Sequence, residues 1–337
     1  MSEPLVTVAI PTLSAGEKLA ECLASLECQT FRDYDVCVID NSGRQLAAAA
    51  AERWRGVAVI ENAWNAGFGA AVNQAFRRSG ARYLATLNDD AVADRGWLEG
   101  LVSALESNPQ AGMCASQVRL AGTGTLDSAG MLISSDATSK QRGHLEPAGN
   151  YANPEEVLFP SGSAALYRRK MLDEIGLFDE SFFLYCEDAD LGLRGRWAGW
   201  TCVYEPGAIV DHYYSRTAGA ASPLKAYYVE RNRIFVLFKN FPFRMLLRAP
   251  GATVSRYLWH LASAVRGRGT AGRYREENSG VAGMGYLAAR AHAALPLHLF
   301  RLFKQRRQIR RGARIGSAEF ERLVTKHFIS PREVAEL

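Results

Sequence analysis

The chain of 337 residues has few cysteines and no long hydrophobic run, and each absence narrows what the protein can be. Its six cysteines include no CxxC pair and no metal-ligand spacing, so we expect reduced, mostly buried thiols rather than a disulfide scaffold. No stretch of about 18 uncharged apolar residues is present, which argues against an integral membrane protein. The first residues show no basic segment followed by an apolar run, so no secretory signal is expected.

Acidic residues are scarce in one long segment. Residues 244–314 hold 15 Lys and Arg against two Glu, whereas residues 1–243 have a net charge of −7. Apolar side chains alternate with these arginines, a pattern typical of helices that lie on anionic membranes. A solvated helical face is the alternative, and nucleic-acid binding is not expected because no module for it is recognisable. The apolar side chains are Tyr257, Leu258, Trp259, Leu261, Leu295, Leu297, Leu299, Phe300, Leu302 and Phe303.

Apolar β-rich runs alternate with helical patterns through residue 107. This alternation predicts βαβ units and a mainly parallel sheet flanked by helices. The expected strands are 5–10, 35–39, 57–60 and 83–87, and the expected helices are 16–29, 46–54, 69–79 and 96–107. Beyond residue 112 the pattern is less regular. There we expect short strands at 121–150, a helix at 187–198, a strand at 201–204 and helices from residue 223 onward.

Polar side chains follow three of the expected strands. Pro11-Thr12, Asp40-Asn41 and Asn88-Asp89-Asp90 each come directly after an apolar run. Because ligands of open α/β sheets bind beyond the carboxyl ends of the strands, these clusters are expected to converge. The adjacent carboxylates repel each other, and a divalent cation bridging to a diphosphate would compensate their charge. A solvated turn with a helix cap is the alternative for Asn-Asp-Asp taken alone.

Two carboxylates open the helix expected at 187–198. Glu187 and Asp188 follow five apolar or aromatic residues, and apolar surroundings increase the basicity of a carboxylate, as a general base requires. The alternative is a helix N-terminus whose acids are favoured by the helix dipole. His212 follows another apolar run, where a structural histidine is the competing interpretation.

Taken in order, these clusters resemble the inverting family 2 glycosyltransferases with a GT-A fold, in particular their bacterial rhamnosyltransferase-like branch. The resemblance covers roughly residues 5–240. It is carried by Val8-Ala-Ile-Pro11-Thr12, Val38-Ile-Asp40-Asn41-Ser42, Asn65-Ala-Gly67-Phe68-Gly69 with Asn73, Leu87-Asn88-Asp89-Asp90, Gly176 to Leu191, His212 and Tyr227-Tyr228-Val-Glu-Arg231-Asn232. It implies a Rossmann-like catalytic domain at 1–240 that binds a nucleotide sugar. The basic helical region at 241–337 would contact a membrane surface or another subunit.

The resemblance also implies roles for single residues. Asp188 matches the carboxylate that deprotonates the acceptor hydroxyl, and Glu187 would orient the acceptor or that base. Asp90 and His212 match ligands of Mg²⁺ or Mn²⁺, although Asn88 replaces the first Asp of the strict DxD pattern. The residues expected around the nucleotide sugar are Pro11, Thr12, Asp40, Asn41, Asn65, Gly67, Asn88, Asp89 and Arg231, the last either on the diphosphate or paired within its helix.

The function implied is inverting transfer of a sugar to a hydroxyl of a lipid-linked or growing bacterial cell-surface glycan. The expected donor is dTDP-L-rhamnose, with UDP- and GDP-sugars as alternatives. Two other functions stay open: a nucleotidyltransferase, which would need a basic glycine-rich loop that Pro11–Gly16 lacks, and a non-catalytic nucleotide-sugar-binding module. We expect a cytoplasmic protein, either free or peripheral at the inner face of the plasma membrane, that can form a homo-oligomer.

Overall fold

The computed structural model describes residues 3–51, 53, 54, 56–213, 222–267, 272 and 280–336. The chain forms two compact units, each built from segments that are separate in the sequence. The sheet unit comprises Met1–Met131, Gln141–Phe183 and Trp200–Tyr214, and the helical unit comprises Leu132–Lys140, Leu184–Gly199 and Ser215–Leu337. The expected division into 1–240 and 241–337 concerns the roles of two regions and remains a prediction.

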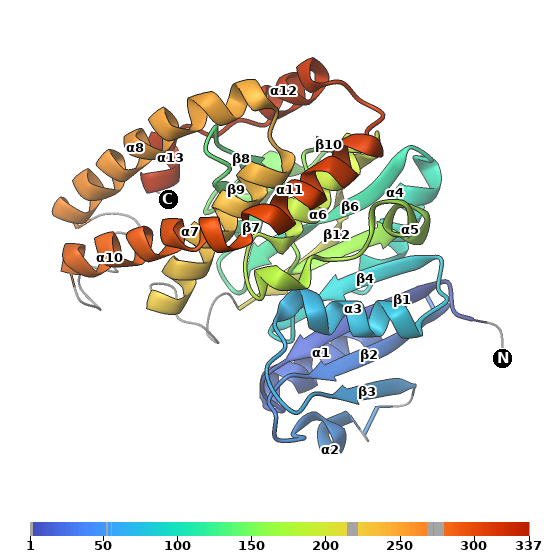
Figure 1. Ribbon diagram of the computed structural model, residues 1–337. Coiled ribbons are helices and arrows are strands. Elements are labelled where there is room, and N and C mark those ends of the chain that lie inside the picture. The colour runs from blue at the N-terminus through green and yellow to red at the C-terminus, as the bar shows by residue number, and fades with distance from the viewer. Residues whose placement is uncertain are drawn as a thin grey trace. The chain divides into compact units, whose positions relative to one another are not determined.

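Four parallel strands form one half of the sheet. They are β1 (Val6–Thr12), β2 (Tyr34–Asp40), β3 (Val57–Glu61) and β4 (Tyr83–Leu87). The three polar clusters lie at the carboxyl ends of β1, β2 and β4. Their order in the sheet is β3-β2-β1-β4, and each neighbouring pair is parallel (Figure 1). In chain order, β2 and β3 are added on one side of β1, and β4 is then added on the opposite side of β1. The topological switch point, where open α/β sheets bind ligands, therefore lies between β1 and β4.

The longer helices of the sheet unit bury apolar side chains against the sheet unit's core. In the first of them, Leu19, Cys22, Leu23 and Leu26 recur at helical spacing and are all buried. The helices are α1 (Glu17–Glu27), α2 (Ala47–Ala51), α3 (Phe68–Arg78), α4 (Trp97–Ser107) and α5 (Arg169–Ile175), with 3₁₀ turns at Ala148–Tyr151 and Glu180–Phe182. The alternation of strands and helices expected through residue 107 is confirmed.

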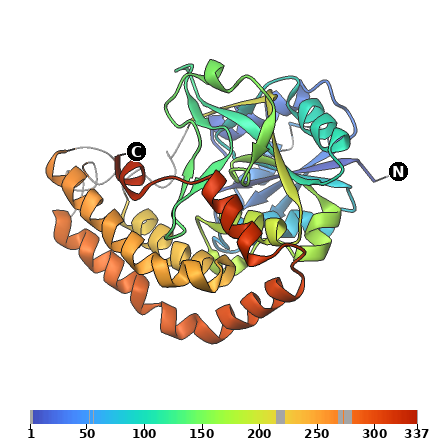
Figure 2. The ribbon, with the colours of Figure 1, turned by 90° about the horizontal axis from the view of Figure 1, so that it is seen from above.

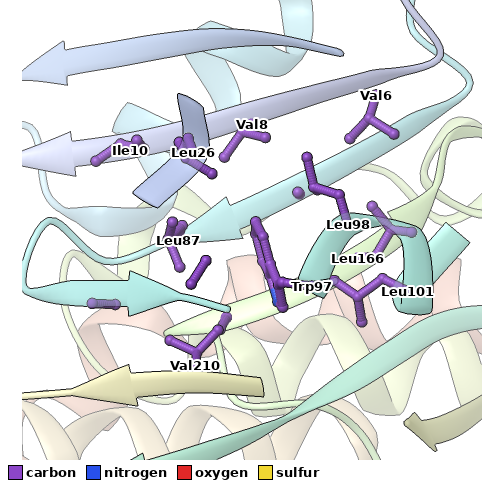
Figure 3. Packing of buried hydrophobic residues seen from close by; sticks show 14 of the residues in the cluster. Val6, Val8, Ile10, Leu26, Leu87, Trp97, Leu98, Leu101, Leu166 and Val210 are labelled. Carbon is purple, nitrogen blue, oxygen red and sulfur yellow. The ribbon is translucent and has the colours of Figure 1, made fainter. Parts of the chain in front are cut away.

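One hydrophobic core holds these elements together. Val6, Val8 and Ile10 point to the same face of β1, because side chains alternate along a strand. They belong to one buried cluster with Leu26 of α1 and Trp97 of α4 (Figure 3). All five are at most 2% exposed, so the packing fixes where the carboxyl ends of β1 and β4 lie.

Six further strands extend the sheet. They are β5 (Ala91–Ala93), β6 (Ala111–Leu120), β7 (Leu126–Ser128), β10 (Glu155–Val157), β11 (Ala164–Arg168) and β12 (Thr201–His212). Antiparallel β11 lies between β4 and β6, and β6 pairs in parallel with β12. The sequence pattern does not predict β6, whose first eight residues are all buried and therefore show no alternation. Its polar side chains are satisfied internally: Trp97 Nε1 donates to Ser116 Oγ and Gln117 Nε2 donates to the Tyr204 hydroxyl, both at 2.9 Å.

The helical unit contains the helix expected at 187–198 and the helices expected from residue 223 onward. They are α6 (Glu187–Trp197), α7 (Pro223–Asn240), α8 (Phe243–Val265), α10 (Gly280–Ala293), α11 (Leu295–Arg311), α12 (Ser317–Lys326) and α13 (Pro331–Glu336). Both α10 and α11 pack against α7, and α13 packs against α8. Figures 1 and 2 show α8 and α11 as long helices of this unit. In the described ranges, no helix has the length and apolar composition needed to cross a bilayer.

A buried network of charges joins α7 and α8 to a hairpin of the helical unit. The hairpin consists of β8 (Met131–Ile133) and β9 (Ser139–Gln141). In its turn, Asp136 accepts from Arg256 Nε at 2.7 Å and lies 3.5 Å from Arg233 Nη1. Glu230 pairs with both arginines. Burial alone would raise the pKa of Asp136, but the two arginines outweigh burial and hold the pKa below its usual value of 3.8.

Replacing Asp136 with Ala should lower the free energy of unfolding by about 3–5 kcal/mol, because two arginines would stay buried without one of their counter-charges. The difference should shrink as the pH falls below about 4, since a carboxylate with a lowered pKa loses its contribution when it is protonated. Urea unfolding followed by circular dichroism measures both effects. The control is Glu336→Ala, which removes an exposed partner of Arg332 and should cost less than about 1 kcal/mol. Equal losses in the two variants would contradict the role given to the network.

Candidate active site

Thr12 and Asp89 meet at the switch point of the sheet. Thr12 ends β1, Asp89 follows β4, and Thr12 Oγ1 donates to Asp89 Oδ2 at 2.6 Å. Burial raises the pKa of Asp89 to about 6, and the hydrogen bond from Thr12 offsets only part of this. Pro11 is tolerated in this central strand because β1 pairs with β4 only as far as Ala9, so no ladder hydrogen bond to β4 is lost.

Asp40 shapes the loop that follows β2. Its Oδ1 accepts from Ser42 N and its Oδ2 accepts from Ala47 N, both at 2.8 Å, and the side chain is buried. Burial would raise the pKa of Asp40, but hydrogen bonds from Ser42 and Ala47 outweigh it and lower the pKa below 3.8. The Asp40 carboxylate therefore stabilises the loop between β2 and α2. Its contact with a nucleotide remains a prediction.

Side-chain amides connect the end of β2 to the loop that begins α3. Asn62 Nδ2 donates to Asn41 Oδ1 at 2.7 Å, and Asn41 Nδ2 donates to Gly67 O at 3.3 Å. Asn65 Oδ1 accepts from Gly67 N at 2.9 Å. Both the N–H and the carbonyl of Gly67 are therefore held by asparagine side chains. Asn41, Asn65 and Gly67, which the sequence predicts at one site, thus lie together.

Gly67 allows a tight entry into α3. Its φ of +87° is one that L side chains rarely adopt, and a Cβ atom there would lie 2.3 Å from the carbonyl oxygen of Phe183. That carbonyl accepts from Phe68 N at 2.8 Å. The structure therefore shows that Gly67 serves the entry into α3, and its expected place beside a nucleotide sugar remains a prediction.

His212 lies between two carboxylates. It ends β12, and its Nδ1 is 2.9 Å from Asp127 Oδ2 while its Nε2 is 3.1 Å from Asp90 Oδ1. Asn88 Nδ2 is also 3.2 Å from Nε2. These contacts form because β12 pairs with β5, which follows the Asn-Asp-Asp turn and places His212 opposite Ala91. The structure thus brings together Asn88, Asp90 and His212, which are far apart in the sequence.

Asp127 is a site residue that the sequence analysis missed. Burial would raise its pKa, but hydrogen bonds from His144 and His212 hold the pKa at about 2. For His212, burial lowers the pKa, yet Asp127 and Asp90 outweigh burial and raise it to about 9. A carboxylate on one ring nitrogen fixes the tautomer and orientation of the imidazole. No local signal identifies Asp127, because it sits in the three-residue strand β7 and reaches the site only through pairing with β6.

Three acids open α6 in the helical unit, and their surroundings differ. Asp190 is fully buried and bound by Arg194 Nε and Lys239 Nζ, both at 2.9 Å, so it anchors the helix. Glu187 is also buried, and its Oε2 has no hydrogen-bond partner in the described part of the chain. Burial and the charge of Asp188 raise the pKa of Glu187 well above 4.5. Asp188 is only half-buried.

The chain enters α6 through a strained turn. Tyr185 and Cys186 have φ values of +68° and +66°, which are uncommon for residues other than glycine. Asn232 of α7 is fully buried and donates from Nδ2 to the carbonyls of Leu184 and Tyr185, both at 2.8 Å. Arg231 Nε in turn donates to Asn232 Oδ1 at 2.9 Å. Arg231 thus pairs within its helix, one of the two expected alternatives, and its contact with a diphosphate remains a prediction.

Comparison with known sequences identifies relatives of the chain. The model of the family described as Glycosyl transferase family 2 matches residues 7–176. An N-acetylglucosaminyl-diphospho-decaprenol L-rhamnosyltransferase of Mycobacterium tuberculosis (strain CDC 1551 / Oshkosh) is 30% identical over 259 residues. That alignment covers 68% of this chain and 82% of the relative.

Two solved structures resemble the chain in fold. The crystal structure of GalNAc-T7 with UDP, GalNAc and Mn²⁺ has a TM-score of 0.60 at 14% identity, over 88% of this chain and 58% of that one. The mannosyltransferase PcManGT from Pyrobaculum calidifontis, in complex with GDP-Man and Mn²⁺, has a TM-score of 0.55 at 17% identity, over 93% and 86%. The expected GT-A fold with a helical C-terminal region is confirmed. From the matched family model and the rhamnosyltransferase relative, the chain belongs to glycosyl transferase family 2.

Proposed function

We propose that the protein transfers L-rhamnose from dTDP-L-rhamnose, with inversion, to a hydroxyl of a lipid-linked or growing bacterial cell-surface glycan. Membership of the family supports glycosyl transfer. The name of the M. tuberculosis relative supports rhamnose as the sugar and a lipid diphosphate as the kind of acceptor. The observation that carries the proposal is the buried contact of Asp90 with His212 beside the switch point, where a nucleotide sugar would bind.

The groups around Asp90 fit a divalent cation that a nucleotide completes. Within the described ranges, no set of three or more His, Cys, Asp or Glu side chains is arranged to hold a metal ion. The protein would therefore supply two donors, Asp90 and His212, and the diphosphate would supply oxygens. A mixed oxygen and imidazole set suits Mn²⁺ better than Mg²⁺, which prefers oxygen alone. When bound, the ion would neutralise charge on the departing nucleoside diphosphate.

Asp188 is proposed as the general base. It would accept the proton of the acceptor hydroxyl while the hydroxyl oxygen bonds to the anomeric carbon. The bond from that carbon to the nucleoside diphosphate breaks on the opposite side, so the configuration inverts. Glu187, whose raised pKa keeps it protonated at neutral pH, would donate a hydrogen bond that orients the acceptor or Asp188.

Replacing Asp188 with Asn should reduce the rate of transfer at least about a hundredfold, because a carboxamide cannot accept the proton. Replacing its neighbour Glu187 with Gln should cost less than about tenfold, because the carboxamide resembles the neutral carboxylic acid in shape and hydrogen bonding. Transfer is measured with dTDP-L-rhamnose and a lipid-linked N-acetylglucosaminyl diphosphate.

Calorimetric titration with dTDP and Mn²⁺ provides the control, since both variants should bind the nucleotide like the wild type. Wild-type turnover in Asp188→Asn would contradict the role of the base. Nucleotide binding by a wild-type protein that transfers no sugar would instead favour the non-catalytic module.

We propose Asp127 as the positioning residue of His212. It holds Nδ1, so that Nε2 faces Asp90, and it lies too deep to touch a substrate directly. Carboxylates in this position orient metal-binding imidazoles and raise their basicity. Asp211 directly precedes His212, but its side chain is exposed, so we do not expect it to orient the ring.

Asp127→Asn should weaken binding of dTDP in the presence of Mn²⁺ by about 10–100-fold, because the His212 ring loses its orientation. Asp211→Asn should leave the affinity within about twofold, because it removes a similar charge that does not touch the ring. Calorimetry with Mn²⁺ and with EDTA measures the metal-dependent part. An equal loss in both solutions would show that Asp127 supports the fold alone.

Action at the inner face of the plasma membrane is part of the same proposal. The acceptor named for the M. tuberculosis relative contains decaprenol, a long lipid. An enzyme that uses such an acceptor must work at a bilayer surface.

A further inference from the structure

One side of α8 exposes a continuous row of large apolar side chains. At about 100° per residue, the six positions fall within about 60° of one another around the helix axis and extend over about 33 Å. Their exposed fractions range from 45% for Leu261 to 69% for Phe243. This α8 stripe consists of Phe243, Leu247, Val254, Leu258, Leu261 and Val265.

The stripe is separate from the side of α8 that packs in the helical unit. Met245, Ala249 and Thr253 are buried, and Arg256 belongs to the network around Asp136. Two side chains that the sequence placed with the exposed apolar group lie elsewhere. Tyr257 donates to Glu230 in that network, and Leu302 of α11 is fully buried. What remains exposed is a contiguous apolar face, which marks an interaction surface more reliably than scattered apolar residues do.

The charge beside the stripe indicates what covers it. Helix α8 contains three arginines and no acidic residue, and Arg244 and Arg248 are exposed along one flank of the stripe, where Arg248 also pairs with Glu321 of α12 at 3.0 Å. Exposed Phe300 and Arg307 of α11 repeat the combination of apolar and basic side chains. The surrounding segment 244–314 has a net charge of +13. A second copy would bring this charge against itself, whereas an anionic surface would neutralise it.

We propose that the α8 stripe and the arginines beside it bind the anionic face of a phospholipid bilayer. The helix would lie in the plane of the headgroups, with its apolar side chains in the boundary between headgroups and acyl chains and its arginines on the lipid phosphates. The inference rests on residues of the helical unit alone. It identifies the surface by which the protein would bind the membrane that the proposed function requires. It does not depend on the residues proposed for sugar transfer.

Flotation of the full-length protein with vesicles tests this surface. The wild type should float with vesicles of phosphatidylcholine and phosphatidylglycerol and stay behind with phosphatidylcholine alone. The triple variant Val254→Ser/Leu258→Ser/Leu261→Ser should bind the anionic vesicles at least about tenfold more weakly, because burial of apolar area supplies much of such binding. Trp64→Ser, which removes a side chain that is 74% exposed in the sheet unit, is the apolar control and should float like the wild type.

Charge is tested with a second matched pair. Arg244→Glu should weaken binding to the anionic vesicles, and Arg322→Glu, at an exposed position of α12, should not. Equal binding of the wild type to neutral and anionic vesicles would overturn the proposal. Flotation of the triple variant like the wild type would also overturn it.

The oligomeric state and nucleotide binding complete the test. Light scattering should show the same mass for the wild type and the triple variant. A wild-type dimer that the triple variant dissociates would assign the stripe to a second copy and overturn the proposal. Each variant should still bind dTDP with Mn²⁺, so that loss of lipid binding is distinguished from failure of the proposed transfer function.

Discussion

A buried imidazole held between two carboxylates is the contact on which the candidate site depends. His212 comes from β12, Asp127 from β7 and Asp90 from the turn after β4, so the contact forms only when all three are in register. The core around β1 and α4 fixes the turn, and β6 fixes both β7 and β12. Fold and site therefore share one constraint: a shift in this register would separate the groups proposed to hold the nucleotide.

The start of α6 shows how neighbouring acids receive different properties. Asp190 is neutralised by buried cations, burial and the charge of Asp188 raise the pKa of Glu187, and Asp188 is partly exposed. Because successive residues of a helix point in different directions, one turn can present all three surroundings. The strained backbone that leads into this turn is held by Asn232, whose side-chain amide reaches two carbonyls at once. Hydrogen bonds from α7 thus offset the free-energy cost of this strained backbone.

Local patterns account for what the sequence predicts well. Strand β4 has the expected bounds, because an apolar run with polar ends needs no tertiary information. Strand β6 escapes detection because it is buried on both faces, and its Ser116 and Gln117 find partners only in the fold. Asp127 and Asn232 escape for a related reason: each acts through a contact between distant segments. In the basic helical segment, composition predicts an amphipathic surface, but only the structure separates the α8 stripe from interior residues such as Tyr257.

The proposed function requires that His212 and the nucleotide diphosphate bind the same divalent cation. Pulsed electron paramagnetic resonance of Mn²⁺ with dTDP and the full-length protein tests it most directly, because the electron spin couples to ligand nuclei. We expect ³¹P couplings from the diphosphate together with a ¹⁴N coupling from an imidazole, and loss of the ¹⁴N coupling in a folded His212→Ala variant. Identical spectra for the wild type and the variant would contradict it.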